Sequence, residues 1–212
     1  MHTELSADSN TAAEAYLEAN HAAGSSLGAI CFTEHRLYPT DARTLKQYGE
    51  LSEKYGVHIF RGLEADTDLG HLLLFGITDA VMMRFDLGQR MLRSRELIRV
   101  LHDEGGIAIP AHPFRDSGYG HRLSELQAQL GTALTAIETI NGQNTPEQNR
   151  LAVEIGEKTK LTGVAGSDAH FASGDWFLTC ATEFAVEVRS VDAMCAELRG
   201  GRVHARLLNQ VR

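Results

Sequence analysis

The sequence predicts an α/β fold whose polar residues gather at the carboxyl ends of its strands. Helical and strand patterns alternate along the chain, which is typical of βα units and a mainly parallel sheet. Five apolar runs each end on or beside a His, Glu, Asp or Asn. Such strand ends suit a barrel with its site at the C-terminal face. The length of 212 residues allows one domain, residues 1–212, with a full core.

Helix boundaries are marked by capping residues and glycines. Asp86, followed three residues on by Gln89, predicts the capping box of a helix that ends at residues 102–104, where Gly105 and Gly106 stop it. Residues 145–148, Thr-Pro-Glu-Gln, predict the start of a helix that runs to about Lys158. Three further helices are expected over residues 10–23, 41–55 and 190–198.

Eight apolar segments have the length of strands, and turn or helix signals separate them. They lie near residues 28–33, 57–63, 71–77, 106–111, 134–140, 161–166, 178–184 and 202–207. The chain contains neither a P-loop nor a Rossmann glycine motif, so neither kind of nucleotide site is predicted. The G-x-S-x-G motif of a nucleophile elbow is also absent, so the sequence does not predict Ser167 as a catalytic nucleophile.

Composition narrows the functional class. Hydrophobic content of 43% and charged content of 23% are those of a soluble globular protein. No apolar run approaches the roughly 20 residues needed to cross a bilayer, and the start lacks a signal-peptide pattern, so we expect a cytoplasmic protein. The net charge of -8 argues against nucleic-acid polymers as partners, an argument strengthened by the absence of an obvious Lys/Arg cluster. The three separated cysteines are expected to be reduced.

Seven residues near the strand ends and the amino terminus are candidates for one shared metal site, because imidazole and carboxylate groups are the usual protein ligands of Zn, Mn and Fe. They are His2, Asp8, His35, Glu64, His112, Asp168 and His170. Each also has a structural interpretation: His35 could cap a loop, for example, and Glu64 could be a solvated strand end. Their recurrence in order along the chain favours the shared site.

Three other residues are candidates for contacts with a substrate. Arg115 follows His112 by three residues and could bind a phosphate bidentately. The alternative for Arg115 is a surface ion pair with Asp116. His71, at the start of a strand, and His121, in a glycine-rich loop, are second-rank substrate or metal candidates.

In these motifs the chain resembles the PHP (polymerase and histidinol phosphatase) domain family. The matching segments are residues 2–9, 32–35, 62–64, 111–113, 138–142, 166–170 and 201–203. The resemblance implies a distorted (βα)7 barrel with two or three divalent ions at its C-terminal face, and hydrolysis of phosphate esters. The family opens with a first strand followed by Asp-x-His-x-His. His2 matches the second histidine of that motif, so the first strand is expected to be missing from this sequence.

The resemblance also implies a role for each metal ligand. Glu64 would bridge two ions, Asp168 would join one of them and His112 would bind the other. Asp8, His35 and His170 would hold a third ion. Asn141 stands where a further ligand or a substrate contact is expected.

The resulting hypothesis is a metal-dependent phosphoesterase acting on a small phosphorylated metabolite or nucleotide. A hydroxide bridging two ions would attack phosphorus, and Arg115 would stabilise the phosphoryl oxygens. His170, His71 or a metal-bound water would protonate the leaving oxygen. Mn, Zn and Fe are the candidate ions, with Mg as a fourth. Two alternatives remain open: a catalytically degenerate module that binds metal or a partner, and a nuclease. The sequence leaves the oligomeric state undetermined.

Overall fold

The computed structural model describes residues 1–115, 119–173 and 176–208 as a mixed α/β fold. All eight predicted strands are present, each within a few residues of its expected bounds. The strands are β1 (Ala29–His35), β2 (His58–Asp66), β3 (His71–Phe75), β4 (Ile107–Pro110), β5 (Ala136–Asn141), β6 (Thr162–Gly166), β7 (Cys180–Phe184) and β8 (Val203–Leu207).

Four of the predicted helices form close to their expected positions. These are α1 (Ala13–Ala22), α2 (Ala42–Tyr55), α6 (Pro146–Thr159) and α7 (Val191–Arg199). The reciprocal capping box of α6 is confirmed, because Thr145 and Gln148 each bond the other's backbone. The sequence analysis missed four short elements: α3 (Asp79–Arg84), α5 (Leu123–Leu130) and the 3-10 turns η1 (Gly120–Arg122) and η2 (Gly131–Ala133).

The helix expected from Asp86 begins later than predicted. Gln89 Nε2 donates to Asp86 Oδ2 at 3.0 Å, and the Gln89 amide donates to the Asp86 carbonyl at 3.1 Å, so the two residues close a turn. The helix itself, α4 (Ser94–Asp103), starts several residues further on. Asp side chains bond nearby backbone in turns as readily as at helix starts, which explains why the motif misled the prediction.

The expectation of a mainly parallel sheet is wrong. β1 pairs in parallel with β2, and β5 pairs in parallel with β6. The pairs β2–β3, β3–β4 and β7–β8 are antiparallel. Residues 67–70 alone connect β2 to β3, and a loop this short permits a hairpin but not the crossover that a parallel pair requires.

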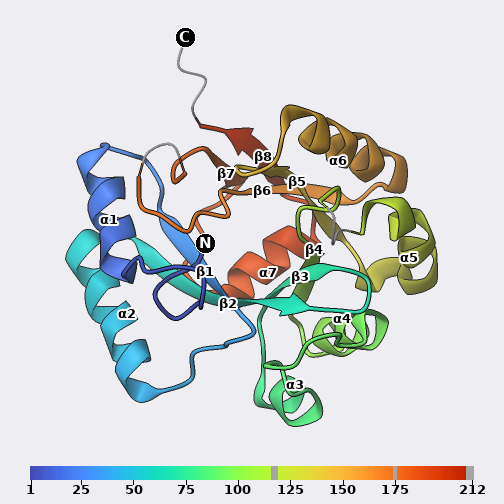
Figure 1. Cartoon of the computed structure of the whole chain (residues 1–212), viewed down its shortest axis with the longest axis horizontal. Coiled ribbons are helices and arrows are strands. Elements are labelled where there is room, and N and C mark those ends of the chain that lie inside the picture. Colours follow the sequence, from blue (N-terminus) through green and yellow to red (C-terminus); the bar gives the residue numbers. More distant parts are fainter. Residues whose placement is uncertain (116–118, 174–175, 209–212) are drawn as a thin grey trace.

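The strands do not close into the expected (βα)7 barrel by hydrogen bonding within the described part of the chain. They form a four-stranded sheet, β1-β2-β3-β4, and two pairs, β5-β6 and β7-β8. β4 contacts β5, and β6 contacts β7 and β8, so the three sheets lie side by side. Helices α1 and α2 flank one side of the strands, and α5 and α6 flank the other (Figure 1).

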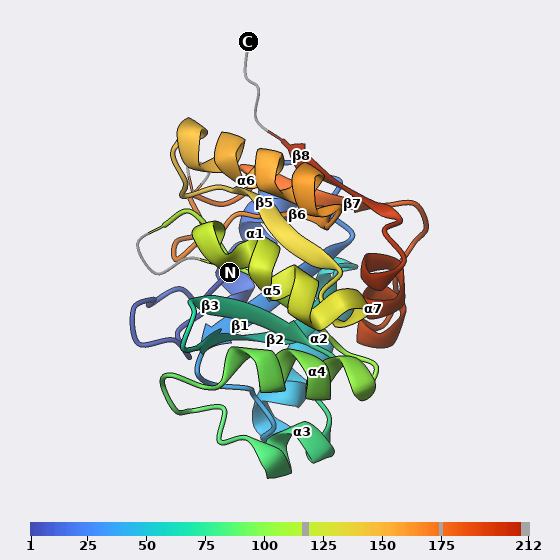
Figure 2. The ribbon, with the colours of Figure 1, turned by 90° about the vertical axis from the view of Figure 1, so that its right-hand side faces the viewer.

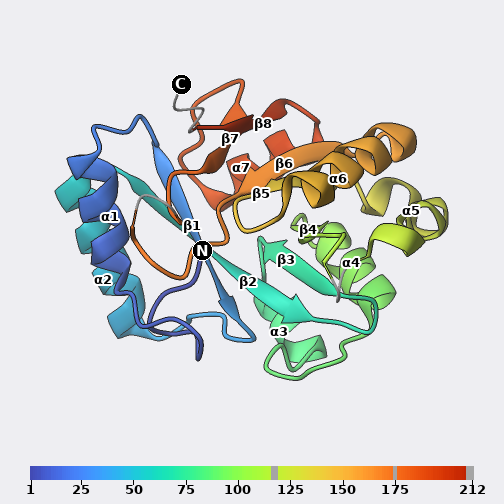
Figure 3. The ribbon, with the colours of Figure 1, turned by 45° about the horizontal axis from the view of Figure 1, so that its top comes forward.

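The amino terminus lies in the middle of the molecule, beside β1 and β2 (Figure 3). Met1 N donates to the Cys31 carbonyl at 3.4 Å, and the Thr33 amide donates to the Met1 carbonyl at 2.9 Å. This is the hydrogen-bond pattern of a parallel strand pair, so Met1 lies against the edge of β1 that β2 leaves free. Beside Met1 a cavity of about 770 Å³, lined largely by apolar groups, separates β1 from β6 and β7.

Apolar side chains fill the space between the sheets and the helices. At one end α7 supplies Met194 and Leu198, which pack against Phe60 and Ile107 of the strands. Figure 2 shows α7 at one edge of the molecule, with α4 below the strands and α6 above them. Cys31, Cys180 and Cys195 are free thiols. Within the described residues, no helix combines the length and apolar character that crossing a bilayer requires.

Candidate metal centre

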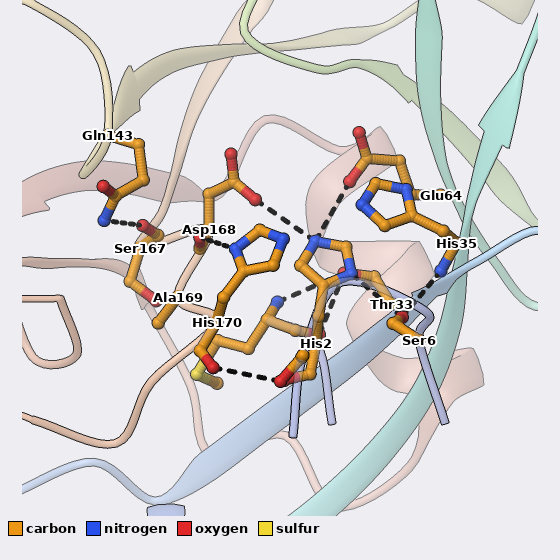
Figure 4. A network of polar contacts seen from close by, with 12 residues as sticks. His2, Ser6, Thr33, His35, Glu64, Gln143, Ser167, Asp168, Ala169 and His170 are labelled. Atoms are coloured by element: carbon orange, nitrogen blue, oxygen red, sulfur yellow. Dashed lines mark hydrogen bonds and ion pairs between the residues drawn. The ribbon is translucent and has the colours of Figure 1, made fainter. Parts of the chain in front are cut away.

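Three histidine rings from separate segments stack at the amino terminus. His2 comes from the opening loop, His35 ends β1, and His170 follows β6. The ring centroids of His2 and His35 lie 4.2 Å apart, and those of His2 and His170 lie 4.5 Å apart. Asp8 Oδ2 lies 3.2 Å from His35 Nε2 and 3.3 Å from His170 Nε2. The structure therefore brings Asp8, His35 and His170 together as predicted, with His2 beside them. Figure 4 shows the three histidines.

Glu64, at the end of β2, is the centre of a second set. Its Oε1 lies 2.6 Å from His71 Nδ1 and 3.0 Å from His112 Nε2, while its Oε2 lies 3.3 Å from His2 Nε2. Sequence reasoning ranked His71 second. The β2–β3 hairpin explains its presence, because it pairs Asp66 with His71 and so returns His71 to the end of β2.

Asp168 connects the two sets, since its Oδ1 lies 3.2 Å from His2 Nε2. The backbone of Asp168 is left-handed, with a φ of 53°, and that of His112 has a φ of 29°. Such values are uncommon outside glycine, although Asp and His are among the residues that tolerate them best. At both strand ends the turn directs a side chain toward Glu64, which is a typical place for backbone strain to be retained.

Arg115 bonds three oxygens of the site. Its Nη1 donates to Asp168 Oδ2 at 2.7 Å, its Nη2 to Asn141 Oδ1 at 2.7 Å and its Nε to Asn144 Oδ1 at 2.8 Å. Each Nη atom retains one further N–H. Asp116, the alternative partner, lies outside the described residues. The Asn141 oxygen also accepts the Gln143 amide at 2.8 Å, so two donors already occupy it.

Glu138, a buried carboxylate that the sequence analysis missed, holds His112 and Asn141 in place through hydrogen bonds. Glu138 is 3% exposed, and its Oε2 accepts the His112 amide at 2.7 Å and Asn141 Nδ2 at 3.0 Å. Burial raises the pKa of Glu138 to about 7. Gly166 lies against it, and a Cβ there would come within 2.9 Å of Glu138 Oε1. The sequence did contain a sign of this role, because Glu138 is a charged residue inside the apolar run 134–140.

The pKa values of the site reflect competition between burial and pairing. Burial would lower the pKa of His2, but Asp168 and Glu64 raise it above its ordinary value. Burial would also lower the pKa of His112, but the contact with Glu64 raises it above its ordinary value. For Asp168, burial acts to raise the pKa, yet contacts with His2 and Arg115 lower it overall. These groups are therefore held as ion pairs when no other cation is present.

The chemistry of this donor set fits divalent metal ions. Three overlapping groups each offer ligand atoms within 4.8 Å of one another: His2, His35 and His170; Glu64, His71 and His112; and His2, Glu64 and Asp168. His112 Nδ1 is buried without a hydrogen-bond partner. Carboxylates and imidazoles that converge in this way require positive charge between them, from protons or from bound cations.

The structure does not support two further expectations from the sequence. His121 lies in η1, is exposed, and its ring faces Phe114 at a centroid distance of 5.9 Å, so it is not brought into either ligand set.

The chain also has an arginine cluster that the sequence analysis overlooked. Arg84, Arg93, Arg95 and Arg99 line one hollow with Asp68, Glu96 and Asp103. Glu96 pairs with both Arg84 and Arg93, which leaves little free positive charge.

The fold of most of the chain is shared with solved proteins. PsfC from Pseudomonas syringae PB-5123 has a TM-score of 0.63 at 19% identity, covering 93% of this chain and 83% of that one. A protein provisionally named a metal-dependent phosphoesterase, from Bifidobacterium adolescentis, has a TM-score of 0.59 at 16% identity and covers 93% of both chains. An amidohydrolase from Chromobacterium violaceum, with bound sulfate and no metal, has a TM-score of 0.59 at 14% identity, covering 80% and 85%.

Sequence comparison adds a match to a segment within the last third of the chain. Residues 146–203, from α6 to the start of β8, match the model of the PHP-associated family. No protein of curated function matches the chain in sequence. This matched segment agrees with the resemblance to the PHP domain family that the motifs indicate, and the solved proteins share the fold.

Proposed function

We propose that this protein is a metal-dependent hydrolase of phosphate esters, with a small phosphorylated metabolite or nucleotide as substrate. The observation that carries the proposal is the convergence of His2, Glu64 and Asp168, whose ligand atoms are shared between neighbouring sets. Shared ligands suit ions that lie close together, and such pairs of ions suit phosphoryl transfer. The name of the Bifidobacterium protein agrees with this assignment.

Two or three divalent ions fit the ligands present. Glu64 with His71 and His112 would hold one, and His2, His35 and His170 with Asp8 would hold another. Asp168, between the two sets, would contribute to a shared or third position. Mn, Zn and Fe are the ions that this mixture of imidazole and carboxylate prefers. When bound, such ions make water nucleophilic at neutral pH and polarise phosphoryl oxygens.

The remaining residues supply orientation and protons. Arg115 keeps an N–H free on each Nη atom, and both are available to phosphoryl oxygens while Asp168 and Asn141 hold the guanidinium in place. The sulfate bound in the Chromobacterium amidohydrolase is a tetrahedral oxyanion in a similar fold. His71 and His170 have side chains 27% and 20% exposed, so whichever of the two does not bind an ion would be placed to pass a proton to a leaving group.

Turnover of a generic aryl phosphate tests the proposal. The wild-type protein, loaded with Mn or Zn, should hydrolyse it, and Asp168→Ala should lose both turnover and part of the bound metal. No turnover with either ion, in a protein whose Asp168→Ala variant binds the same amount of metal, would reject a phosphoesterase. Metal binding without turnover of any phosphate ester would instead support the degenerate module.

A further inference from the structure

Two segments that carry candidate metal ligands meet at the amino terminus, although they are far apart in the sequence. His2 belongs to the opening loop, and Ala169 and His170 belong to the segment that follows β6. The His2 amide donates to the Ala169 carbonyl at 3.0 Å. One backbone bond does not fix how two segments lie relative to each other. The stacking of the His2 and His170 rings, which Figure 4 shows, therefore depends on further contacts.

Tyr16, in α1, bridges the two segments. Its hydroxyl oxygen lies 2.9 Å from the carbonyl oxygen of His2 and 3.0 Å from that of Ala169. A hydroxyl has one proton, so Tyr16 shares it between the two carbonyls, and the bridge requires both to stay in place. The Tyr16 side chain is fully buried, and its ring packs against Phe177 at a centroid distance of 5.2 Å. The core therefore sets the position of the hydroxyl.

Ser9 and Thr11 add to this bridge from the opening loop. Ser9 Oγ lies 3.1 Å from the carbonyl oxygen of His2 and 3.0 Å from that of His170. The Thr11 hydroxyl donates to the His170 carbonyl at 2.8 Å. All of these contacts are to backbone oxygens. The hydroxyls therefore fix where the two segments lie and do not occupy the ring nitrogens that would bind an ion.

We propose that Tyr16 is a positioning residue for the metal centre, because its bridge holds His2 at the separation from His170 that a shared ion requires. Tyr16 bonds backbone oxygens, so it acts through the two histidines and is not itself a ligand. The significance of the bridge for catalysis rests on the proposed metal-dependent function. The joining of the two segments does not, because it follows from the hydrogen bonds of the protein alone.

The position of the bridge predicts a selective effect. Glu64, His71 and His112 are carried by β2, β3 and the end of β4, and these strands pair with one another. The Tyr16 bridge joins other segments. Its loss should therefore weaken binding of an ion by the three stacked histidines and leave binding at Glu64 nearly unchanged. A general loss of stability would affect both positions.

The chain provides a matched control in Tyr48. This tyrosine lies on α2, is buried, and belongs to the same apolar cluster as Tyr16. Both rings lie near Phe32, at centroid distances of 5.8 Å for Tyr16 and 5.5 Å for Tyr48. The Tyr48 hydroxyl has no hydrogen-bond partner within the described part of the chain. Tyr16→Phe and Tyr48→Phe therefore each remove one buried hydroxyl from one cluster, but only Tyr16→Phe removes a bridge.

The first test is amide hydrogen exchange of His2, followed by NMR in metal-free protein. Tyr16→Phe should speed this exchange by about fivefold, the ratio that one buried hydrogen bond typically contributes. Tyr48→Phe should exchange as wild type does. The double variant Tyr16→Phe/Ser9→Ala removes both hydroxyls that bond the His2 carbonyl and should exchange faster still. Equal exchange in the two tyrosine variants would overturn the inference. Unprotected exchange of this amide in the wild type would overturn it even if no variant folds.

The second test is a zinc titration followed through the NMR signals of the His170 and His71 rings, which report the two positions separately. Tyr16→Phe should weaken the binding that His170 reports by about fivefold and leave the binding that His71 reports close to wild type. Equal weakening at both rings would overturn a positioning role. A wild type that binds no zinc would reject the proposed function, and the exchange of the His2 amide would still decide whether Tyr16 joins the two segments.

Discussion

The two sides of the candidate metal centre differ in burial and in charge. The histidine side consists of His35, His170 and Asp8, and the Asp8 side chain is 53% exposed. The carboxylate side consists of Glu64, Asp168 and Glu138, and the Glu64 side chain is 3% exposed. Electrostatic interactions are screened in water and strong in the interior. The carboxylate side should therefore dominate metal affinity, while the histidine side should be more easily loaded and emptied.

Loss of the central carboxylate should have the largest effect. Glu64→Gln removes the group shared by His2, His71 and His112. Metal affinity and aryl phosphate turnover should both fall by more than the roughly 100-fold that loss of an outer partner costs. Metal analysis and steady-state kinetics measure the two effects. Glu14→Gln, at an exposed carboxylate paired with Lys54, is the control and should behave as wild type. Retention of metal by Glu64→Gln would show that the carboxylate side is not dominant.

Replacement of the arginine should separate catalysis from metal binding. Arg115→Met keeps the length of the side chain but removes the donors that face the phosphoryl group. We expect kcat to fall by about 100-fold, which is typical when one preorganised donor is lost. Metal content should change little, because Arg115 is not a ligand. A loss of metal that parallels the loss of turnover would show that Arg115 only holds Asp168 in place.

The pH dependence of stability should reveal which groups the metal replaces. The pKa values of His2 and His112 are raised, so in the metal-free protein their stabilising contribution is complete below the unfolded value of about 6.5. It is lost as the pH rises through the raised values. Metal binding requires the neutral rings. The increase in Tm on adding Zn or Mn should therefore be larger at pH 8 than at pH 6. Equal increases at the two pH values would contradict the assignment of these rings as ligands.

The exposed carboxylate should matter least. Asp8→Asn keeps the size of the side chain and removes a charge that is largely in solvent. Exposed pairs contribute about 0.2–1 kcal/mol, so metal affinity should fall at most about fivefold. Isothermal titration would measure this change. A loss as large as that of Glu64→Gln would remove the distinction between the two sides.

The sequence predicted which polar side chains converge better than it predicted the sheet that carries them. His35, Glu64, His112 and Asp168 stand at strand ends, and a strand end is visible as an apolar run followed by a polar residue. The direction of β3 depends on a four-residue loop, and alternation of helices and strands does not reveal it. Glu138 was missed because its role is to hold the His112 amide, a long-range contact with no local pattern.

The most direct measurement is the anomalous scattering of a crystal of the protein soaked in manganese. The account predicts a peak within ligand distance of Glu64, His71 and His112, and a second peak among His2, His35 and His170. Glu64→Gln should lose the first peak. A soaked crystal of active protein with no anomalous peak near Glu64 would contradict the central claim that these side chains form a metal centre.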